Sequence, residues 1–202
     1  MNKGILLVIS GPSGTGKGTV LKTVFQHKND IVLSISATTR PKRENEIDGK
    51  DYFFMSKSDF EELIKKNQVL EYAEYCGNYY GTPQKAVEEW INAGKTVILE
   101  VETQGAFQIK EKFPEAVLIF LLPPSFNDMK NRLVNATTGT RTDIERRVET
   151  AVLEIGNAHK YDYVVINEDV SAAAMCVSSI IDASFHASHR MGNYINEVLK
   201  KC

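Results

Sequence analysis

The sequence predicts an α/β fold with a parallel five-stranded sheet and flanking helices. Five apolar runs are bounded by turn residues, and helical stretches alternate with them along the chain. The runs are continuous rather than alternating, which is typical of strands buried on both faces of a parallel sheet. The predicted strands are 4–10, 31–36, 96–102, 116–122 and 161–167.

A glycine-rich segment, "GPSGTGKGT", follows the first predicted strand and nearly matches the phosphate-binding loop G-x-x-x-x-G-K-[ST]. In such a loop, backbone N–H groups and the start of the next helix bind an anion, and the lysine reaches the outer phosphates. Val20, Leu21, Val24 and Phe25 then recur at helical spacing, as the motif requires. The predicted nucleotide-binding residues are Gly11, Pro12, Ser13, Gly14, Thr15, Gly16, Lys17, Gly18 and Thr19.

Gly18 stands where this motif has a serine or threonine that contacts magnesium. Magnesium usually keeps several waters and takes few protein ligands beside substrate phosphates, so another water can replace the hydroxyl. We therefore expect Mg²⁺ as cofactor with no direct protein ligand, while Thr19 contacts an inner phosphate. The "GKGT" run is similar to the loop of adenylate kinases. It favours a phosphotransferase between nucleotides over a switch GTPase.

Two regions interrupt the alternation of strands and helices. Residues 38–82 carry charged turns, a predicted helix at 58–66 and short aromatic strands, and they are interpreted as an inserted α+β lobe. The small, polar segment 135–142 is a candidate mobile lid loop between two helices. The remaining predicted helices are 83–93, 125–134, 143–158 and a segment from Ser171 that breaks near Gly192.

Composition indicates an ordinary globular chain. Its 202 residues are 43% hydrophobic and 25% charged with a net charge of −2, which gives no indication of nucleic-acid or membrane binding. Three scattered cysteines, Cys76, Cys176 and Cys202, predict reduced thiols rather than disulfides or a zinc site. No apolar run approaches the ~20 residues of a membrane span, and the run before Gly11 is too short for a secretory signal. We expect a soluble, cytoplasmic protein.

Four further motifs, "TTRPKR", "DGKDYFF", "GNYYGT" and "QGA", follow the loop in the order and at the spacing of guanylate kinases. The chain resembles this family from about Gly4 to about Asp169. The resemblance implies transfer of the γ-phosphate of ATP to GMP with Mg²⁺, in purine metabolism and GMP recycling. It also implies a single domain: a P-loop core (1–37, 83–124 and 156–202), a GMP-binding lobe (38–82) and a helical lid (125–155).

Several residue roles follow from the resemblance. The GMP phosphate would be held by Arg40, Arg43, Tyr52 and Tyr80, and the guanine would be read by Ser36, Glu71 and Thr82, with Glu102 near the base or ribose. Lys17, Arg132, Arg147 and Arg43 would act in transfer, Asn167 would lie beside the adenine, and Glu100 would reach magnesium through water.

Residue chemistry agrees with these roles, although simpler interpretations exist. Two guanidinium groups around Pro41 suit an exposed phosphate, but a solvated basic turn is the alternative. One carboxylate can accept from both the N1–H and the exocyclic amine of guanine, and adenine offers the opposite pattern. Glu100 and Glu102 lie two apart on one strand face, where either alone could be a polar strand end.

The sequence departs from the family at two places. Family members commonly have Asp at positions 100 and 102, and they show R-x-x-x-R-G in the lid, whereas Ala136 occupies the second arginine position here. Arg141 either replaces that arginine or is an exposed loop charge. The alternatives to a guanylate kinase are another nucleoside monophosphate kinase, which makes Glu71 and Thr82 structural, and a binding module for a phosphorylated partner. Intact Gly16 and Lys17 weigh against the module, while the missing lid arginine favours it or a slower enzyme.

Overall fold

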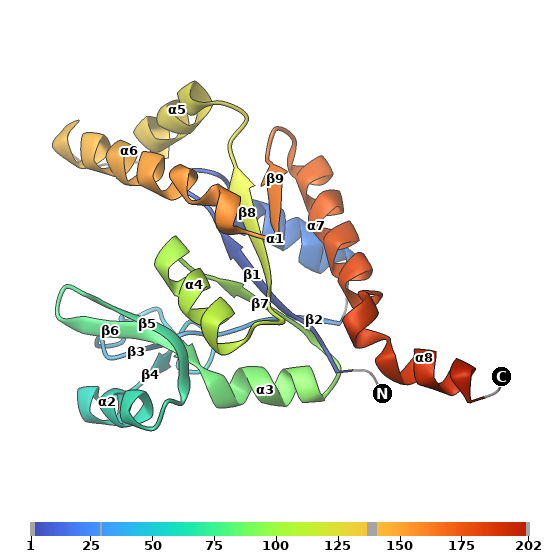
Figure 1. Ribbon diagram of the computed structural model, residues 1–202. Coiled ribbons are helices and arrows are strands. Elements are labelled where there is room, and N and C mark those ends of the chain that lie inside the picture. The colour runs from blue at the N-terminus through green and yellow to red at the C-terminus, as the bar shows by residue number, and fades with distance from the viewer. Residues whose placement is uncertain (1–2, 29, 137–140, 201–202) are drawn as a thin grey trace.

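The computed structural model describes residues 3–28, 30–136 and 141–200, and it omits the side chains of 135, 136, 141 and 142. Its main sheet has five parallel strands in the order β2-β7-β1-β8-β9 (Figure 1). The strands are β1 (Leu6–Ser10), β2 (Ile31–Leu33), β7 (Thr96–Glu100), β8 (Val117–Leu122) and β9 (Tyr163–Ile166). The predicted parallel five-stranded sheet is confirmed.

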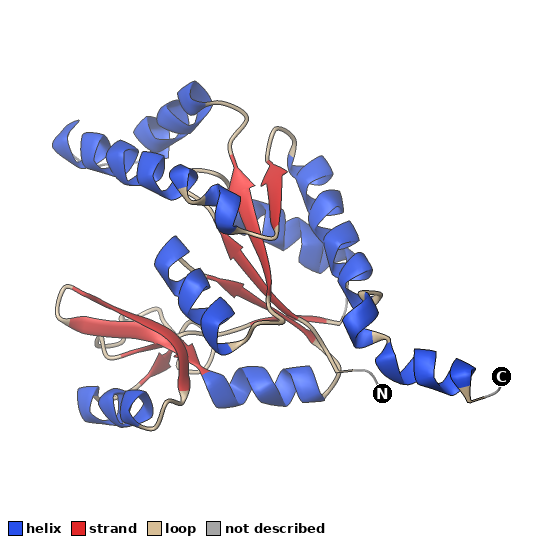
Figure 2. Cartoon of the chain, viewed as in Figure 1, coloured by secondary structure: helices blue, strands red, loops and turns tan. Residues whose placement is uncertain are grey.

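Both faces of this sheet are covered by helices, as the continuous apolar runs predict. Leu7 and Ile9 of β1 face α1 (Lys17–His27) and α7 (Val170–Phe185), where they join one buried cluster. Leu6 and Val8 belong to the opposite cluster with residues of α3 (Gln84–Asn92) and α4 (Thr103–Lys112). Figure 2 shows these helices on the two sides of the sheet.

A second, four-stranded sheet has the order β4-β3-β6-β5 and is mostly antiparallel. Its elements are β3 (Ala37–Thr38), β4 (Phe53–Phe54), α2 (Lys57–Lys65), β5 (Val69–Tyr75) and β6 (Asn78–Pro83). Ser56 caps the start of α2, because its Oγ accepts from the backbone N–H of Asp59 at 3.1 Å. Its Phe60 is fully buried in this sheet's small core.

Helices α5 (Phe126–Ala136) and α6 (Arg141–Gly156) project together from the carboxyl end of the main sheet (Figure 1). Met129 and Leu133 of α5 pack against Ala151 of α6. After α7, a turn at Ser188–Arg190 leads into α8 (Gly192–Leu199), so the predicted break near Gly192 is found. No helix within the described ranges has the length and apolar character needed to cross a membrane.

Several predicted bounds are wrong. The strand predicted at 31–36 ends at Leu33, and the following residues lead into β3 of the other sheet. Helix α4 at Thr103–Lys112 was not predicted. The segment 135–142, predicted as a loop, contributes its first two residues to α5 and its last two to α6, while 137–140 lie outside the described residues.

Candidate functional site

The glycine-rich loop (residues 11–19) connects β1 to α1 at the carboxyl end of the main sheet. Gly16 precedes α1 with φ of 84°, a left-handed conformation that favours glycine, and no side chain caps the helix there. The first-turn N–H groups of α1 are therefore not occupied by a capping side chain. A loop of this shape at a helix start favours an anionic ligand.

The ammonium of Lys17 lies against the beginning of its own loop. Its Nζ donates to the carbonyl of Gly11 at 2.6 Å and to that of Pro12 at 3.2 Å. Burial lowers the pKa of Lys17, while the nearby carboxylates of Glu100, Glu154 and Glu102 oppose this effect. Three acidic side chains therefore help to keep a partly buried ammonium charged beside the loop.

Asn167 supports the same loop from the end of β9. Its Nδ2 donates to the carbonyl of Thr15 at 2.7 Å, and a Cβ at Gly16 would approach Nδ2 to 2.7 Å. The side chain is buried, and its Oδ1 has no hydrogen-bond partner among the described residues. Asn167 thus fixes the loop and keeps one buried acceptor, which is a structural role the sequence did not suggest.

A cavity of about 480 Å³ lies between the two sheets. It is within the usual size range of small-molecule sites. Its lining includes predicted residues from both sheets: Ser36, Tyr52, Glu71, Tyr80, Glu100 and Glu102. The structure therefore brings the predicted base-reading carboxylate of Glu71 to one cavity with Glu100 and Glu102. The strand predicted at 96–102 ends at Glu100, however, and Glu102 precedes the first residue of α4, so the two glutamates do not share a strand face.

Glu71 is the most buried acidic side chain on this cavity, 8% exposed. Thr82 Oγ1, itself buried, donates to Glu71 Oε1 at 2.7 Å. Burial raises the pKa of Glu71; the Thr82 hydrogen bond lowers it, Glu102 raises it and Lys112 lowers it. The pair is a preformed, poorly solvated acceptor for N–H donors.

The backbone at Glu71 departs from regular pairing. Val69 pairs with Pro83 and Tyr72 with Gly81, so β5 carries one more residue than β6 between these pairs. This is a β-bulge, a feature that re-aims side chains and is common next to functional sites. The bulge places Glu71 beside Thr82 and the cavity.

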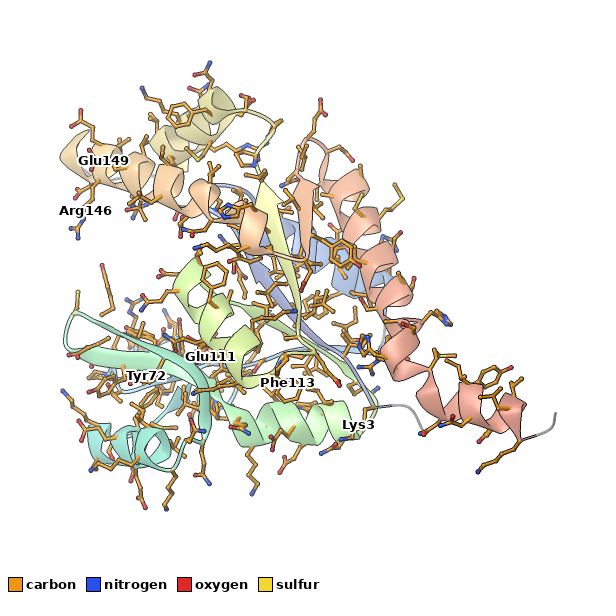
Figure 3. The ribbon with its side chains drawn as sticks, in the orientation of Figure 1. Lys3, Tyr72, Glu111, Phe113, Arg146 and Glu149 are labelled. Carbon is orange, nitrogen blue, oxygen red and sulfur yellow. The ribbon has the colours of Figure 1, made fainter. Side chains whose placement is uncertain are left out.

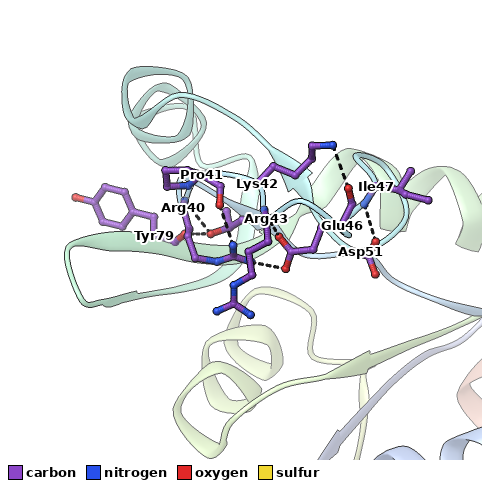
Figure 4. A network of polar contacts seen from close by, with 9 residues as sticks. Arg40, Pro41, Lys42, Arg43, Glu46, Ile47, Asp51 and Tyr79 are labelled. Carbon is purple, nitrogen blue, oxygen red and sulfur yellow. Dashed lines mark hydrogen bonds and ion pairs between the residues drawn. The ribbon is translucent and has the colours of Figure 1, made fainter.

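The basic turn after β3 is held by an acidic residue, as Figure 4 shows. Arg40 Nη2 contacts Glu46 Oε1 at 2.7 Å, and the backbone N–H of Arg43 donates to Glu46 Oε2 at 2.8 Å. The Arg40 guanidinium also lies 5.7 Å from the ring centroid of Tyr52. The guanidinium of Arg43 extends away from this network (Figure 4), and its side chain is exposed.

The predicted lid residues lie on α5 and α6. Arg132 approaches the glycine-rich loop, because a Cβ at Gly14 would lie 3.5 Å from the Cβ of Arg132. Arg147 is an exposed residue of α6. The side chains of Ala136 and Arg141 lie outside the described part of the structure, so the replacement of the missing arginine stays a prediction.

The structure combines a loop suited to anions, a cavity lined by the buried carboxylate of Glu71, and a basic turn; the loop, Arg40, Arg43 and Thr82 are not among the residues that line this cavity. The family model for guanylate kinase matches residues 3–184 of this chain. The chain belongs to the guanylate kinase family. The resemblance drawn from the four motifs is thereby confirmed.

Similar proteins cover nearly the whole chain. A guanylate kinase from Oceanobacillus iheyensis is 48% identical over 198 residues, which is 98% of this chain and 96% of that protein. One from Clostridioides difficile is 48% identical and covers 100% of this chain and 98% of its own length. A crystal structure of guanylate kinase from Anaplasma phagocytophilum matches with a TM-score of 0.70 and 35% identity over 94% of this chain and 90% of that chain.

Sequence reasoning missed three side chains at this guanylate kinase site. Glu154 of α6 interacts electrostatically with Lys17 and Glu102, and burial raises its pKa while Lys17 lowers it. Glu46 holds the basic turn, and Gln108 of α4 bonds the strand that carries Glu71. Each is an unremarkable polar residue in a turn or helix, and no local pattern marks it.

Proposed function

We propose that this chain transfers the γ-phosphate of ATP to GMP, forming ADP and GDP in purine nucleotide metabolism and GMP recycling. Family membership over nearly the full chain supports the reaction. The choice of acceptor rests on Glu71, which lines the cavity between the sheets and accepts a hydrogen bond from the buried hydroxyl of Thr82. The proposal includes a cytoplasmic location, where these nucleotides are substrates.

The Glu71 carboxylate accepts from the N1–H and the exocyclic amine of guanine. The Thr82 hydroxyl already donates to Oε1 of Glu71. Each carboxylate oxygen can accept two hydrogen bonds, so Oε1 can still accept from the base. Ser36 and Glu102, on the same cavity, complete contacts to the base or ribose. Adenine would leave the buried carboxylate unpaired, which is strongly unfavourable.

The GMP phosphate binds to the basic turn. Arg40 and Arg43 supply guanidinium groups, and Tyr52 and Tyr80 supply hydroxyls; the two rings lie edge to face with centroids 6.1 Å apart. Glu46 holds Arg40 and the backbone of Arg43 before the phosphate arrives. A preorganised turn loses less conformational entropy on binding than a free one.

The ATP phosphates bind to the glycine-rich loop and Lys17, with Asn167 near the adenine. Transfer requires alignment of donor and acceptor and neutralisation of charge rather than covalent catalysis. Lys17, Arg132 and Arg147 stabilise the charge on the moving phosphoryl group. Lys17 is suited to this because its contacts to Gly11 and Pro12 place it at the loop without occupying the N–H groups.

Mg²⁺ fits this donor set through water rather than through a protein cage. Among the described residues, no group of three or more His, Cys, Asp or Glu side chains could hold a metal ion, and Gly18 has no side chain to offer. Glu100 would bind metal-bound water, which its exposed carboxylate at the end of β7 supports. When bound, the ion screens the charge of the donor phosphates.

The proposed division of the chain is a core (1–37, 83–124 and 156–202), a GMP-binding lobe (38–82) and a lid (125–155). Movement of the lobe and lid toward the core would exclude water from the transfer. The α5–α6 pair has its own small apolar cluster and so is suited to move as a unit.

One assay tests the reaction. ADP formation is measured with ATP–Mg²⁺ and GMP, IMP, AMP, CMP or UMP in turn. We expect strong turnover with GMP alone among the common monophosphates. Comparable use of AMP would replace the proposal with another monophosphate kinase, and GMP binding without turnover would replace it with a binding module.

A further inference from the structure

One face of helix α4 contacts the bulged strand β5 through three positions, Gly105, Gln108 and Lys112. Their spacing of three and four residues places them in one row along the helix. β5 is the last strand of its sheet, so among the described residues its outer edge has no neighbouring strand. Helix α4 supplies hydrogen-bond partners to this edge.

Gln108 bonds both backbone groups of one residue. Its Oε1 accepts from the N–H of Tyr72 at 3.1 Å, and its Nε2 donates to the carbonyl of Tyr72 at 3.4 Å. Tyr72 follows Glu71 directly and is where regular pairing with β6 resumes. Figure 3 shows Tyr72 on β5 beside α4.

Lys112 bonds the other side of the bulge. Its Nζ donates to the carbonyl of Val69 at 2.6 Å, and Val69 is the last regularly paired residue before Glu71. The two side chains of α4 therefore fix the backbone immediately before and after the extra residue. A slip of this register would turn Glu71 to the other face of the sheet.

Gly105 allows the carboxylate itself to contact the same helix. A Cβ at this position would lie 3.0 Å from Oε2 of Glu71, closer than real Cβ contacts usually are. The carboxylate is thus bounded by Thr82 on one oxygen and by the first turn of α4 on the other. Helix α4 directly follows β7 of the main sheet. This contact therefore fixes the position of the Glu71 carboxylate relative to the main sheet.

We propose that Gln108 and Lys112 are positioning residues that hold the β5 bulge against α4 and thereby set the orientation of Glu71 and the selectivity for guanine. The part of this inference that concerns guanine selectivity rests on the proposed function. The part that concerns the orientation of Glu71 can be tested without turnover. Both side chains act through the backbone of β5, and Gln108 also lines the cavity.

The main test compares Gln108→Leu, which removes both bonds to Tyr72 at similar side-chain size, with Glu111→Leu, a matched change at an exposed position of the same helix. We expect Gln108→Leu to raise KM for GMP by roughly tenfold and to change kcat and KM for ATP less than twofold, because the base contributes binding rather than transfer. The ratio of kcat/KM for GMP to that for IMP should fall, since IMP lacks the amine that Glu71 accepts. Glu111→Leu should change none of these values.

A second measurement does not require activity. The pKa of the Glu71 carboxyl, followed by NMR in the absence of nucleotide, should fall toward its ordinary value in Gln108→Leu as the carboxylate gains water. Gln108→Glu keeps an acceptor for the Tyr72 N–H, so its KM for GMP should lie between those of the unmodified protein and Gln108→Leu, and this comparison serves if the leucine variant does not fold. Lys112→Met should reproduce the kinetic changes in part.

The proposal is overturned if the folded Gln108→Leu and Lys112→Met variants keep the GMP-to-IMP ratio, and Gln108→Leu also keeps the pKa of Glu71, while both lose only thermal stability. That result would make the α4 contacts purely structural. Failure of the proposed function would look different from failure of this inference. It would appear as absence of GMP turnover in the unmodified protein, whatever the titration of Glu71 shows.

Discussion

The hydroxyl of Thr82 and the carboxylate of Glu71 form a buried hydrogen bond of 2.7 Å before any ligand is present. The threonine donor orients the carboxylate and leaves its remaining lone pairs for the ligand. A preformed acceptor of this kind discriminates by what the ligand can donate.

The first prediction is an order of acceptor use, GMP over IMP over AMP. IMP keeps the N1–H and O6 of guanine but lacks the amine, while AMP presents no donor at N1. The kcat/KM for GMP should exceed that for AMP by a factor on the order of 10⁴, because a buried polar group left unpaired is a strong penalty. Initial rates of ADP formation at several concentrations of each acceptor check the order.

The second prediction concerns Glu71→Gln, which should lower kcat/KM for GMP strongly and raise thermal stability. The amide cannot accept from both guanine donors, and a charge-assisted pair is lost. The neutral amide also removes a buried charge, yet its oxygen can still accept from Thr82. Thermal melting of the nucleotide-free proteins and GMP kinetics measure the two effects, and a variant that is less stable at neutral pH contradicts this account.

The pH dependence of the same residue has a definite sign. Because burial raises the pKa of Glu71 in the folded protein, the folded state binds a proton more tightly than the unfolded state. This residue's contribution to stability therefore increases as pH falls through the raised pKa toward the ordinary value, and the Gln variant should lack it. KM for GMP should rise over the same window, since the protonated carboxyl cannot accept from both donors.

The third prediction is that Lys17→Ala loses most turnover and keeps its fold. The charge that would stabilise the transferring phosphoryl group is removed, whereas the side chain contributes only two hydrogen bonds to its own loop. A loss of about 10²- to 10³-fold in kcat is typical when one transition-state donor is removed. Lys22→Ala, an exposed lysine of the same helix, is the control. Near-normal turnover of Lys17→Ala at saturating substrates would exclude the role in transfer.

The fourth prediction concerns Gly18 and magnesium. A Cβ at this position would meet no atom within 4 Å, so Gly18→Ser and Gly18→Ala should both fold. Loss of backbone freedom in the unfolded chain should stabilise each variant by about 0.4–1 kcal/mol. Only the serine restores a hydroxyl for the metal, so only Gly18→Ser should lower the Mg²⁺ concentration that gives half-maximal activity. Equal Mg²⁺ dependence of both variants would contradict the proposed metal environment.

The fifth prediction tests the lid. If Arg141 replaces the arginine absent at position 136, Arg141→Ala should lower kcat more than it weakens ATP binding. Adding Ala136→Arg should then restore part of the lost kcat. Arg146→Ala changes a neighbouring exposed arginine and serves as control (Figure 3). An unchanged kcat in Arg141→Ala would identify Arg141 as a surface charge.

Local motifs were sufficient to predict the core of the fold, and the family resemblance named several residues that line the cavity. The run that became β1 and the glycines and lysine after it carry their own conformational and chemical signals. By contrast, residues 31–36 are uniformly suited to a strand, and only tertiary pairing shows that the chain leaves one sheet after Leu33 and enters another at Ala37. The bond from Gln108 to Tyr72 joins residues far apart in sequence, which a pattern of spacing cannot reveal.

The adjacency of β2 and β7 in the main sheet has an evolutionary consequence. The chain leaves the sheet at the carboxyl end of β2 and re-enters it at the amino end of β7, the neighbouring parallel strand, so the segment between them is one crossover connection. Such a segment can be lengthened, shortened or exchanged without changing the strand order of the main sheet. Acceptor preference can thus diversify while the donor machinery is inherited unchanged. Gly105, Gln108 and Lys112 limit these changes, because they lie on α4, outside the segment between β2 and β7. Any replacement segment has to provide a backbone that can contact these three residues.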